Sequence, residues 1–342
     1  MRLRLLWTLL VLGGLFGLSL SSSATDVPGP AVPLAHGARL PVHSDMSTPF
    51  NLSSLPALIE HEYDGRDLRL GRIVERGLAF TRYEVSYRSG SLNISGVMNV
   101  PRRPGRFPVI VLAHGYADPA TYRTGAGLRR EQAYLASSGY VVLHTDYRNF
   151  AASDRDLRDR GDRPLGYPED LINAALAIKA AGLPFVDTER IGLFGRSMGG
   201  GVTLSALAAY PGLADAAVLS SPVSSDAGDG FDRWVRGTGA LEDRVVDAYG
   251  TPESNPRFWA EVSPRGYLGR VTEPVLIHHG TADDVCRMRW SEATAGALAR
   301  AGKDVQLVRY AGEGHHFDEA WPRLMRRTVD FFDRQLEVRP TS

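Results

Sequence analysis

The chain has 342 residues, of which 43% are hydrophobic, with 39 basic and 39 acidic side chains and a formal net charge of zero. This length suits one large domain or two ordinary ones, and the composition is typical of a globular protein. The balanced charge, without a long basic or acidic run, argues against nucleic acid and acidic polymers as partners.

The first 24 residues carry the order of features found in a secretory signal peptide. Two arginines within Met1–Arg4 precede an apolar run over Leu5–Leu20, and small residues fill Ser21–Ala24. This order predicts export with cleavage after Ala24, and no stable membrane association afterwards. The rival interpretation is an uncleaved membrane anchor, but the run is shorter than the ~20 residues that cross a bilayer.

Residues 25–65 are expected to form a linker or N-terminal arm, because prolines cluster in their first half and no clear periodicity follows. Residues 66–342 are expected to form one domain. Two alternating segments around Ser89–Gly90, in TRYEVSYRSGSLNISGVMNVP, predict a β-hairpin near its start.

Apolar runs then alternate with helical stretches. The runs FPVIVLAHG, GYVVLHTDY, RIGLFG, AAVLSSP and PVLIHHG are typical of strands covered on both faces, and DVQLVRYAG is expected to be the last strand. Helices are expected at Leu128–Ser138, Pro168–Ala181, Met198–Tyr210, Ser291–Ala301 and Glu319–Leu336. This alternation predicts an α/β fold with a mostly parallel, doubly wound sheet and the hairpin as its antiparallel edge.

One connection, residues 222–272, is too long for this rhythm. A connection of this length usually has a function or a structure of its own. We expect a small helical cap insertion over the carboxyl edge of the sheet, with Phe231, Trp234 and Trp259 as walls of a substrate pocket. The alternative is a surface excursion whose aromatic residues only pack it down.

A serine lies in the pattern G-x-S-x-G at Gly195–Gly199, within GRSMGG. The pattern alone is weak. Here, however, Ser197 directly follows the strand RIGLFG and opens a glycine-rich helix, which is the context of a nucleophile elbow. Such a turn lifts the serine Oγ above the sheet edge, beside the free N–H groups of a helix N-terminus. Ser197 is therefore the predicted nucleophile.

A serine nucleophile needs a base, and the base needs an acid that orients it. Asp283 follows a strand in LIHHGTADDV, and His315 follows the last strand in YAGEGHHF. The order serine, acid, histidine, each after a later strand, brings the three loops to the carboxyl edge of a parallel sheet. Asp284 and His316 are the neighbouring alternatives.

The negative charge that develops on a substrate oxygen also needs hydrogen-bond donors. We expect the backbone N–H groups of Met198 and Tyr116 to form an oxyanion hole, with Gly115 in LAHGY letting the backbone come close. His114, His278 and His279 are expected to pack near the site, because their spacing suits no metal.

Cys286 is the only cysteine of the chain, so no intrachain disulfide is expected. No base or cation motif points at it, and we expect a small buried residue.

The region from about Thr81 to Leu336 resembles the α/β-hydrolase fold, and most of all the catalytic domain of the prolyl oligopeptidase family and its dienelactone hydrolase and acetyl esterase relatives. The stretches that carry the resemblance are GRSMGG, HGTADD and GEGHHF, supported by HGY and DYR. It implies a serine hydrolase with Ser197 as nucleophile, Asp283 as acid and His315 as base, without a cofactor or a metal. In this family the acid is the first residue of the DD pair, and the base fills the histidine position of G-H-x-F.

The resemblance implies a small ester or a peptide as the substrate. Peptidases of this family carry a β-propeller upstream, whereas only about fifty residues follow the predicted signal before the hairpin here. We therefore expect ester cleavage more than peptide cleavage. The alternative from another class is a catalytically silent ligand-binding protein on the same fold. The oligomeric state stays open.

Overall fold

The computed structural model describes residues 54–156 and 166–337. The expected signal peptide, residues 1–24, and most of the expected arm, residues 25–65, lie outside these ranges. The described residues belong to one unit, Thr48–Ser342. None of its described helices is both long enough and apolar enough to cross a membrane.

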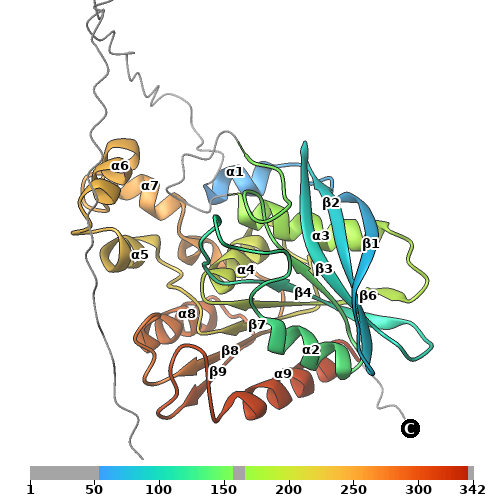
Figure 1. The fold of residues 1–342 in the computed structure, drawn as a ribbon. Helices are drawn as coiled ribbons and strands as arrows, with labels where there is room; N and C mark the ends of the chain where they lie inside the picture. The colour runs from blue at the N-terminus through green and yellow to red at the C-terminus, as the bar shows by residue number, and fades with distance from the viewer. Residues whose placement is uncertain (1–53, 157–165, 338–342) are drawn as a thin grey trace, which may run out of the picture. The chain divides into compact units, whose positions relative to one another are not determined.

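The described strands form one sheet in the order β1-β2-β3-β5-β4-β6-β7-β8-β9 (Figure 1). From β5 to β9 along this order all neighbours are parallel, whereas β1, β2 and β3 pair antiparallel and β3 pairs antiparallel with β5. The predicted, mostly parallel sheet with an antiparallel N-terminal edge is confirmed. The strands span β1 Arg66–Arg76, β2 Phe80–Ser89, β3 Leu92–Pro101, β4 Phe107–Ala113, β5 Val141–Thr145, β6 Val186–Arg196, β7 Ala216–Ser220, β8 Val275–Gly280 and β9 Val305–Tyr310.

The central strand β4 shows why continuous apolar runs form this sheet. All seven of its residues are buried, and alternate side chains enter two different hydrophobic cores. Val109 and Val111 belong to one core, and Ile110 and Leu112 belong to the other. A strand that is covered on both faces therefore has no position for a polar residue.

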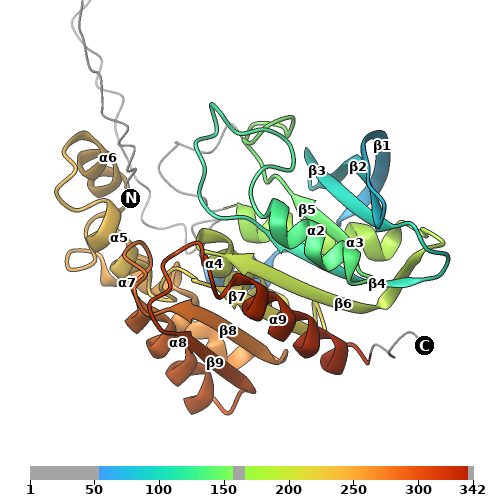
Figure 2. The ribbon, with the colours of Figure 1, turned by 60° about the horizontal axis from the view of Figure 1, so that its bottom comes forward.

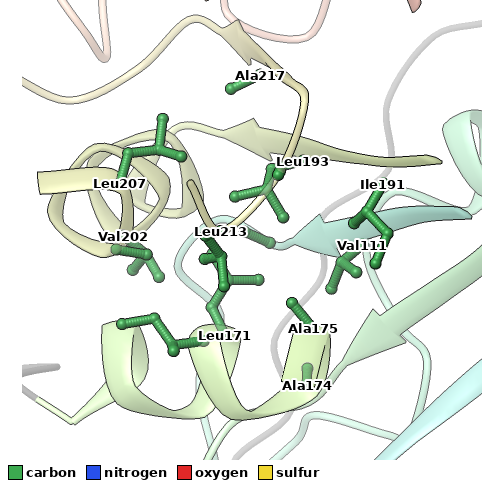
Figure 3. Packing of buried hydrophobic residues seen from close by; sticks show 14 of the residues in the cluster. Val111, Leu171, Ala174, Ala175, Ile191, Leu193, Val202, Leu207, Leu213 and Ala217 are labelled. Carbon is green, nitrogen blue, oxygen red and sulfur yellow. The ribbon is translucent and has the colours of Figure 1, made fainter. Parts of the chain in front are cut away.

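The two cores lie under two sets of helices (Figure 2). Helices α2 and α9 cover one face, and α1, α3, α4 and α8 cover the other. Figure 3 shows the core under α1, α3, α4 and α8, where Leu171, Ala174 and Ala175 of α3 pack toward Val111 of β4 and Ile191 of β6. The helices span α1 Leu55–Glu60, α2 Arg129–Ser137, α3 Tyr167–Ala180, α4 Met198–Ala209, α8 Met288–Arg300 and α9 Trp321–Gln335.

Helix α1 falls in the segment that was expected to be a linker. Its side chains Leu55 and Leu58 are buried in the core beside α4, and Ser54 caps its first turn by accepting a hydrogen bond from the N–H of Ala57. The structured domain therefore begins before residue 66.

The long connection after β7 is helical, as predicted. It contains α5 Ala227–Trp234, α6 Ala240–Tyr249, α7 Pro256–Glu261 and a 3₁₀ helix, η1, at Pro264–Arg270. In Figure 2, helices α5, α6 and α7 lie on the side of the molecule toward which the arrow of β6 points. That is the carboxyl edge, where ligands bind to parallel sheets.

The prediction of a pocket wall is wrong for two of the three aromatic residues, which are buried in the cap instead. Phe231 is 0% exposed and Trp259 is 3% exposed, because their rings pack edge to face, 5.0 Å apart, in the hydrophobic core of the cap. Short helices must bury an apolar face of their own, and these residues supply it. Trp234, in contrast, is 39% exposed and rests against Trp290 of α8.

Candidate active site

Ser197 lies between the end of β6 and the start of α4, with φ 57° and ψ −122°. A positive φ is strained for a residue with a Cβ, so the surroundings must hold it. Its N–H donates to Ser220 O at 3.0 Å, and its carbonyl accepts from the N–H groups of Val223 at 3.1 Å and Gly200 at 2.9 Å. The end of β7 and the loop after it therefore hold the turn that carries the serine through hydrogen bonds.

The glycines around Ser197 allow α4 to approach the sheet closely. A Cβ on Gly199 would lie 2.0 Å from Ala113 O, and a Cβ on Gly195 would lie 2.3 Å from Gly199 O. Both contacts are with backbone atoms, which cannot move aside as a flexible side chain can. The glycine-rich sequence is therefore required by the elbow itself.

Asp283 and His315 meet at the ends of β8 and β9. His315 Nδ1 lies 2.9 Å from Asp283 Oδ2, and the N–H groups of Val285 and Cys286 each donate to Asp283 Oδ1 at 2.9 Å. Burial raises the pKa of Asp283, but the hydrogen bonds from His279 and His315 outweigh it and hold this pKa well below its usual range. The acid is therefore a carboxylate at neutral pH.

The neighbouring alternatives are arranged differently. The side chain of Asp284 is exposed, and its backbone carbonyl accepts a hydrogen bond from Arg233. His316 is exposed as well, and its carbonyl accepts a hydrogen bond from Arg130. Burial lowers the pKa of His316, as do the nearby charges of Arg196 and Arg130. Among these candidates the structure pairs His315 with Asp283.

The hydroxyl of Ser197 does not form a hydrogen bond with His315 among the described contacts. Its polar neighbour is Cys286 Sγ, at 3.8 Å from Ser197 Oγ. Hydrogen bonds between catalytic groups often tighten only when substrate is bound, and rotation about one side-chain bond changes the direction of a serine Oγ.

Cys286 is fully buried, and burial raises the pKa of its thiol to about 12. The thiol is therefore neutral at physiological pH and is not a competing nucleophile. The sequence indicated a buried cysteine but gave no sign that it would contact the predicted nucleophile. That contact arises because the turn after Asp283 carries Cys286 back toward the elbow.

The loop after β4 lies directly against Ser197. A Cβ on Gly115 would lie 3.1 Å from Ser197 Cβ and 3.7 Å from Ser197 Oγ. Within the described part of the chain, no group accepts a hydrogen bond from the N–H of Tyr116 or of Met198, the first residue of α4. Both N–H groups are thus available to a substrate oxygen beside the serine.

A second imidazole, His279, also contacts the acid. Its Nε2 lies 3.3 Å from Asp283 Oδ2. The sequence prediction treated His279 as a packing residue. Its position four residues before the acid, at the end of a buried strand, was the only signal for this contact.

Comparison with known proteins identifies the relatives of this arrangement. A family model described as the prolyl oligopeptidase family matches residues 126–339. Dipeptidyl peptidase 4 of Felis catus is 31% identical over 216 residues, which are 61% of this chain and 26% of that protein. The chain spans about a quarter to a third of the length of the curated relatives it matches first.

Solved structures share the fold. A puromycin-hydrolyzing peptidase of Mycobacterium tuberculosis matches with a TM-score of 0.62 and 25% identity, covering 78% of this chain and 41% of that one. Acetyl xylan esterase 1 of Thermoanaerobacterium sp. matches with a TM-score of 0.61 and 16% identity, covering 81% of this chain and 92% of that one. These matches confirm the predicted α/β-hydrolase fold. The family model covers more than half of the sequence, and the chain therefore belongs to the prolyl oligopeptidase family.

Proposed function

We propose that this protein is a serine hydrolase that cleaves small esters or peptides through an acyl-enzyme. The observation that carries the proposal is the hydrogen-bonded pair of His315 and ionised Asp283, in loops beside a serine held at a strained elbow. Membership of the prolyl oligopeptidase family supports the same class.

The roles follow from the hydrogen bonds. Because His315 Nδ1 donates to Asp283 Oδ2, the other ring nitrogen, Nε2, is the base. It takes the proton from Ser197 Oγ, which attacks the carbonyl carbon. The N–H groups of Met198 and Tyr116 stabilise the oxyanion.

The tetrahedral intermediate then collapses. His315 returns the proton to the leaving alcohol or amine, and the acyl group stays on Ser197. Water, deprotonated by His315, attacks the acyl-enzyme and releases the acid. Every step uses groups of this chain, the substrate and water.

A fluorophosphonate probe tests the proposal, because it reacts only with an activated serine. The wild-type protein should be labelled and should hydrolyse a p-nitrophenyl ester, whereas Ser197→Ala should do neither. His315→Ala should lower kcat by about 10⁵–10⁶, by analogy with other triads. His316→Ala, the matched control next to it, should retain most activity.

Two outcomes would redirect the proposal. Loss of activity in His316→Ala but not in His315→Ala would make the second histidine the base. A well-folded wild-type protein that the probe does not label would favour a silent ligand-binding protein on the same fold.

We also propose that the protein is exported. The proposal rests on the charged, apolar and small-residue order of Met1–Ala24. Sequencing the N-terminus of the secreted or periplasmic protein should give Thr25 as the first residue. A mature protein that keeps Met1 and stays in the membrane would favour the anchor.

A further inference from the structure

His279 contacts the loop after β8 that carries Asp283 and Cys286, the acid loop. It is 0% exposed, near the end of β8. Its Nδ1 lies 2.6 Å from Ser291 Oγ on α8. Its Nε2 lies 2.8 Å from Cys286 O and 3.3 Å from Asp283 Oδ2. The ring therefore connects helix α8 to both ends of the turn that carries the acid.

The partners of the ring require a hydrogen on one of its two nitrogens. Both neighbours of Nε2, a carbonyl oxygen and a carboxylate oxygen, are acceptors only, so Nε2 must carry a hydrogen. Ser291 Oγ, whose hydroxyl can donate or accept, is the partner of Nδ1, so both ring nitrogens have a hydrogen-bond partner. The single Nε2–H is shared between Cys286 O and Asp283 Oδ2.

We infer that His279 is a positioning residue of the catalytic acid, whose Nε2–H fixes Asp283 Oδ2 opposite His315 and closes the turn from Asp283 to Cys286. The inference rests on the proposed function. It goes beyond it by giving Oδ2 a second imidazole partner, so that the orientation and charge of the acid depend on His279 as well as on His315.

Two consequences follow for the base. The N–H of His279 withdraws charge from the oxygen that His315 contacts, so its loss strengthens the attraction between that oxygen and a protonated His315. It also leaves only His315 and the two N–H groups on Oδ1, those of Val285 and Cys286, as described donors that orient the carboxylate.

The other titratable and charged groups that face this cluster come from several elements. Arg233 of α5 lies near the thiol of Cys286, and Arg130 of α2 and Arg196 of β6 lie near His316, which is adjacent to His315. A variant of His279 removes none of these groups.

The test compares amide side chains that replace one ring nitrogen at a time. In His279→Gln the amide nitrogen takes the place of Nε2, whereas in His279→Asn it takes the place of Nδ1. His278→Asn is the matched control, because His278 is the preceding buried residue of β8 but contacts Tyr310 and Thr328. All variants are first labelled with the fluorophosphonate probe and then assayed for kcat and KM against pH.

His279→Asn should lower kcat about 10- to 100-fold with little change in KM, as loss of a hydrogen bond to a charged group allows. The acidic limb of its kcat/KM profile should move to higher pH. His279→Gln should recover most of the loss and return the limb to its wild-type position. His278→Asn should leave both unchanged.

The inference is overturned if His279→Asn matches His278→Asn, if Gln rescues no better than Asn, or if kcat falls while the acidic limb stays in place. Should His279→Asn not fold, Ser291→Ala takes its place, because it removes only the hydroxyl that holds Nδ1. A wild-type kcat and profile for Ser291→Ala overturns the inference as well. Failure of the proposed function is a separate result, since the wild-type protein itself would then not be labelled.

Discussion

Asp283 remains a carboxylate although its side chain has no exposed surface. Two backbone N–H groups hold Oδ1, and two imidazoles lie near Oδ2. An acid whose pKa is lower in the folded protein than in the unfolded chain stabilises the fold above the unfolded pKa. That contribution fades as the pH falls through the unfolded pKa toward the folded one.

Asp283→Asn should therefore lower the free energy of unfolding near neutral pH, and the difference from wild type should shrink as the pH falls below about 4, where the unfolded acid becomes protonated. Urea unfolding of both proteins across this range measures the difference. A deficit that is the same at every pH would mean that the donors around the carboxylate do not lower its pKa. The same substitution should lower kcat by about 10⁴, because the base loses its charged partner.

At the scale of single residues, the sequence predicts a chemical role best where chain order and backbone geometry restrict it together. Ser197 was predicted because its glycine-rich motif lies between a strand and a helix and is followed, in the expected chain order, by an acid and a histidine that each come after a later strand. The contact of His279 with the acid was not predicted, since its position four residues before Asp283, at the end of a strand, does not show which side chain its ring faces. The prediction that Phe231 and Trp259 line a pocket was wrong for the same reason, because the sequence does not show whether an aromatic residue of a short helix faces a pocket or a core.

The elbow is an element whose sequence is limited by backbone contacts. Gly199→Ala would put a Cβ 2.0 Å from Ala113 O and 2.6 Å from His114 O, so α4 would have to move away from β4. We expect a loss of about 3 kcal/mol or more in the free energy of unfolding, at or above the upper end of the cost of overpacking. Thermal or urea unfolding measures this loss.

Gly201→Ala is the control in the same helix. Its Cβ would meet only a methyl group of Val223, at 2.6 Å, and that side chain can rotate. Alanine also gains up to about 1 kcal/mol of helix propensity over glycine. The variant should lie close to wild type in stability, and equal losses for the two variants would contradict the backbone account.

The cap contains one buried tryptophan, Trp259, and one exposed tryptophan, Trp234. Trp259→Ala should destabilise the cap by about 3–5 kcal/mol, because it empties the centre of the cap's core. Trp234→Ala should change stability little. The exposed ring of Trp234 packs against Trp290 in the first turn of α8, the helix that directly follows the acid loop.

Trp234→Ala should therefore change the preference for the acyl-chain length of p-nitrophenyl esters and leave fluorophosphonate labelling intact. The measurement is kcat/KM over a series of chain lengths, with Trp259→Ala as the comparison. An unchanged preference in Trp234→Ala would remove this ring from the substrate site.

Most strands and helices of the sheet layers could be predicted, because buried strands appear in the sequence as continuous apolar runs and surface helices as apolar residues at helical spacing. Strand β1 was not, because it lies at the edge of the sheet and none of its side chains is fully buried. Its apolar residues Leu68, Leu70 and Ile73 are only partly buried, and a register shift between Leu70 and Ile73 interrupts their alternation among charged residues. Helix α1 is too short for its two buried leucines to form a periodic pattern.

For the whole molecule, the choice between ester and peptide depends on what surrounds the serine. The exposed apolar side chains near the elbow and the acid loop are those of Tyr116, Val285 and Trp234. They offer apolar area to an acyl group, although the acid loop also carries the exposed carboxylate of Asp284. Glu242 in the first turn of α6, one acidic candidate for an anchor of a peptide amine, accepts a hydrogen bond from the N–H of Gly237, in the loop before that helix.

Chemistry points the same way. An ester releases an alcohol or a phenol, which is a better leaving group than an amine, so one triad and one oxyanion hole cleave esters faster than amides. We therefore predict that this protein hydrolyses short-chain p-nitrophenyl esters and cleaves small chromogenic peptides more slowly. Kinetics on a panel of both, including peptides with proline, with Ser197→Ala as the blank, measure this. A higher kcat/KM for proline-containing dipeptide amides than for every ester would show that the protein is a peptidase first, and that features other than Tyr116, Val285 and Trp234 bind its substrate.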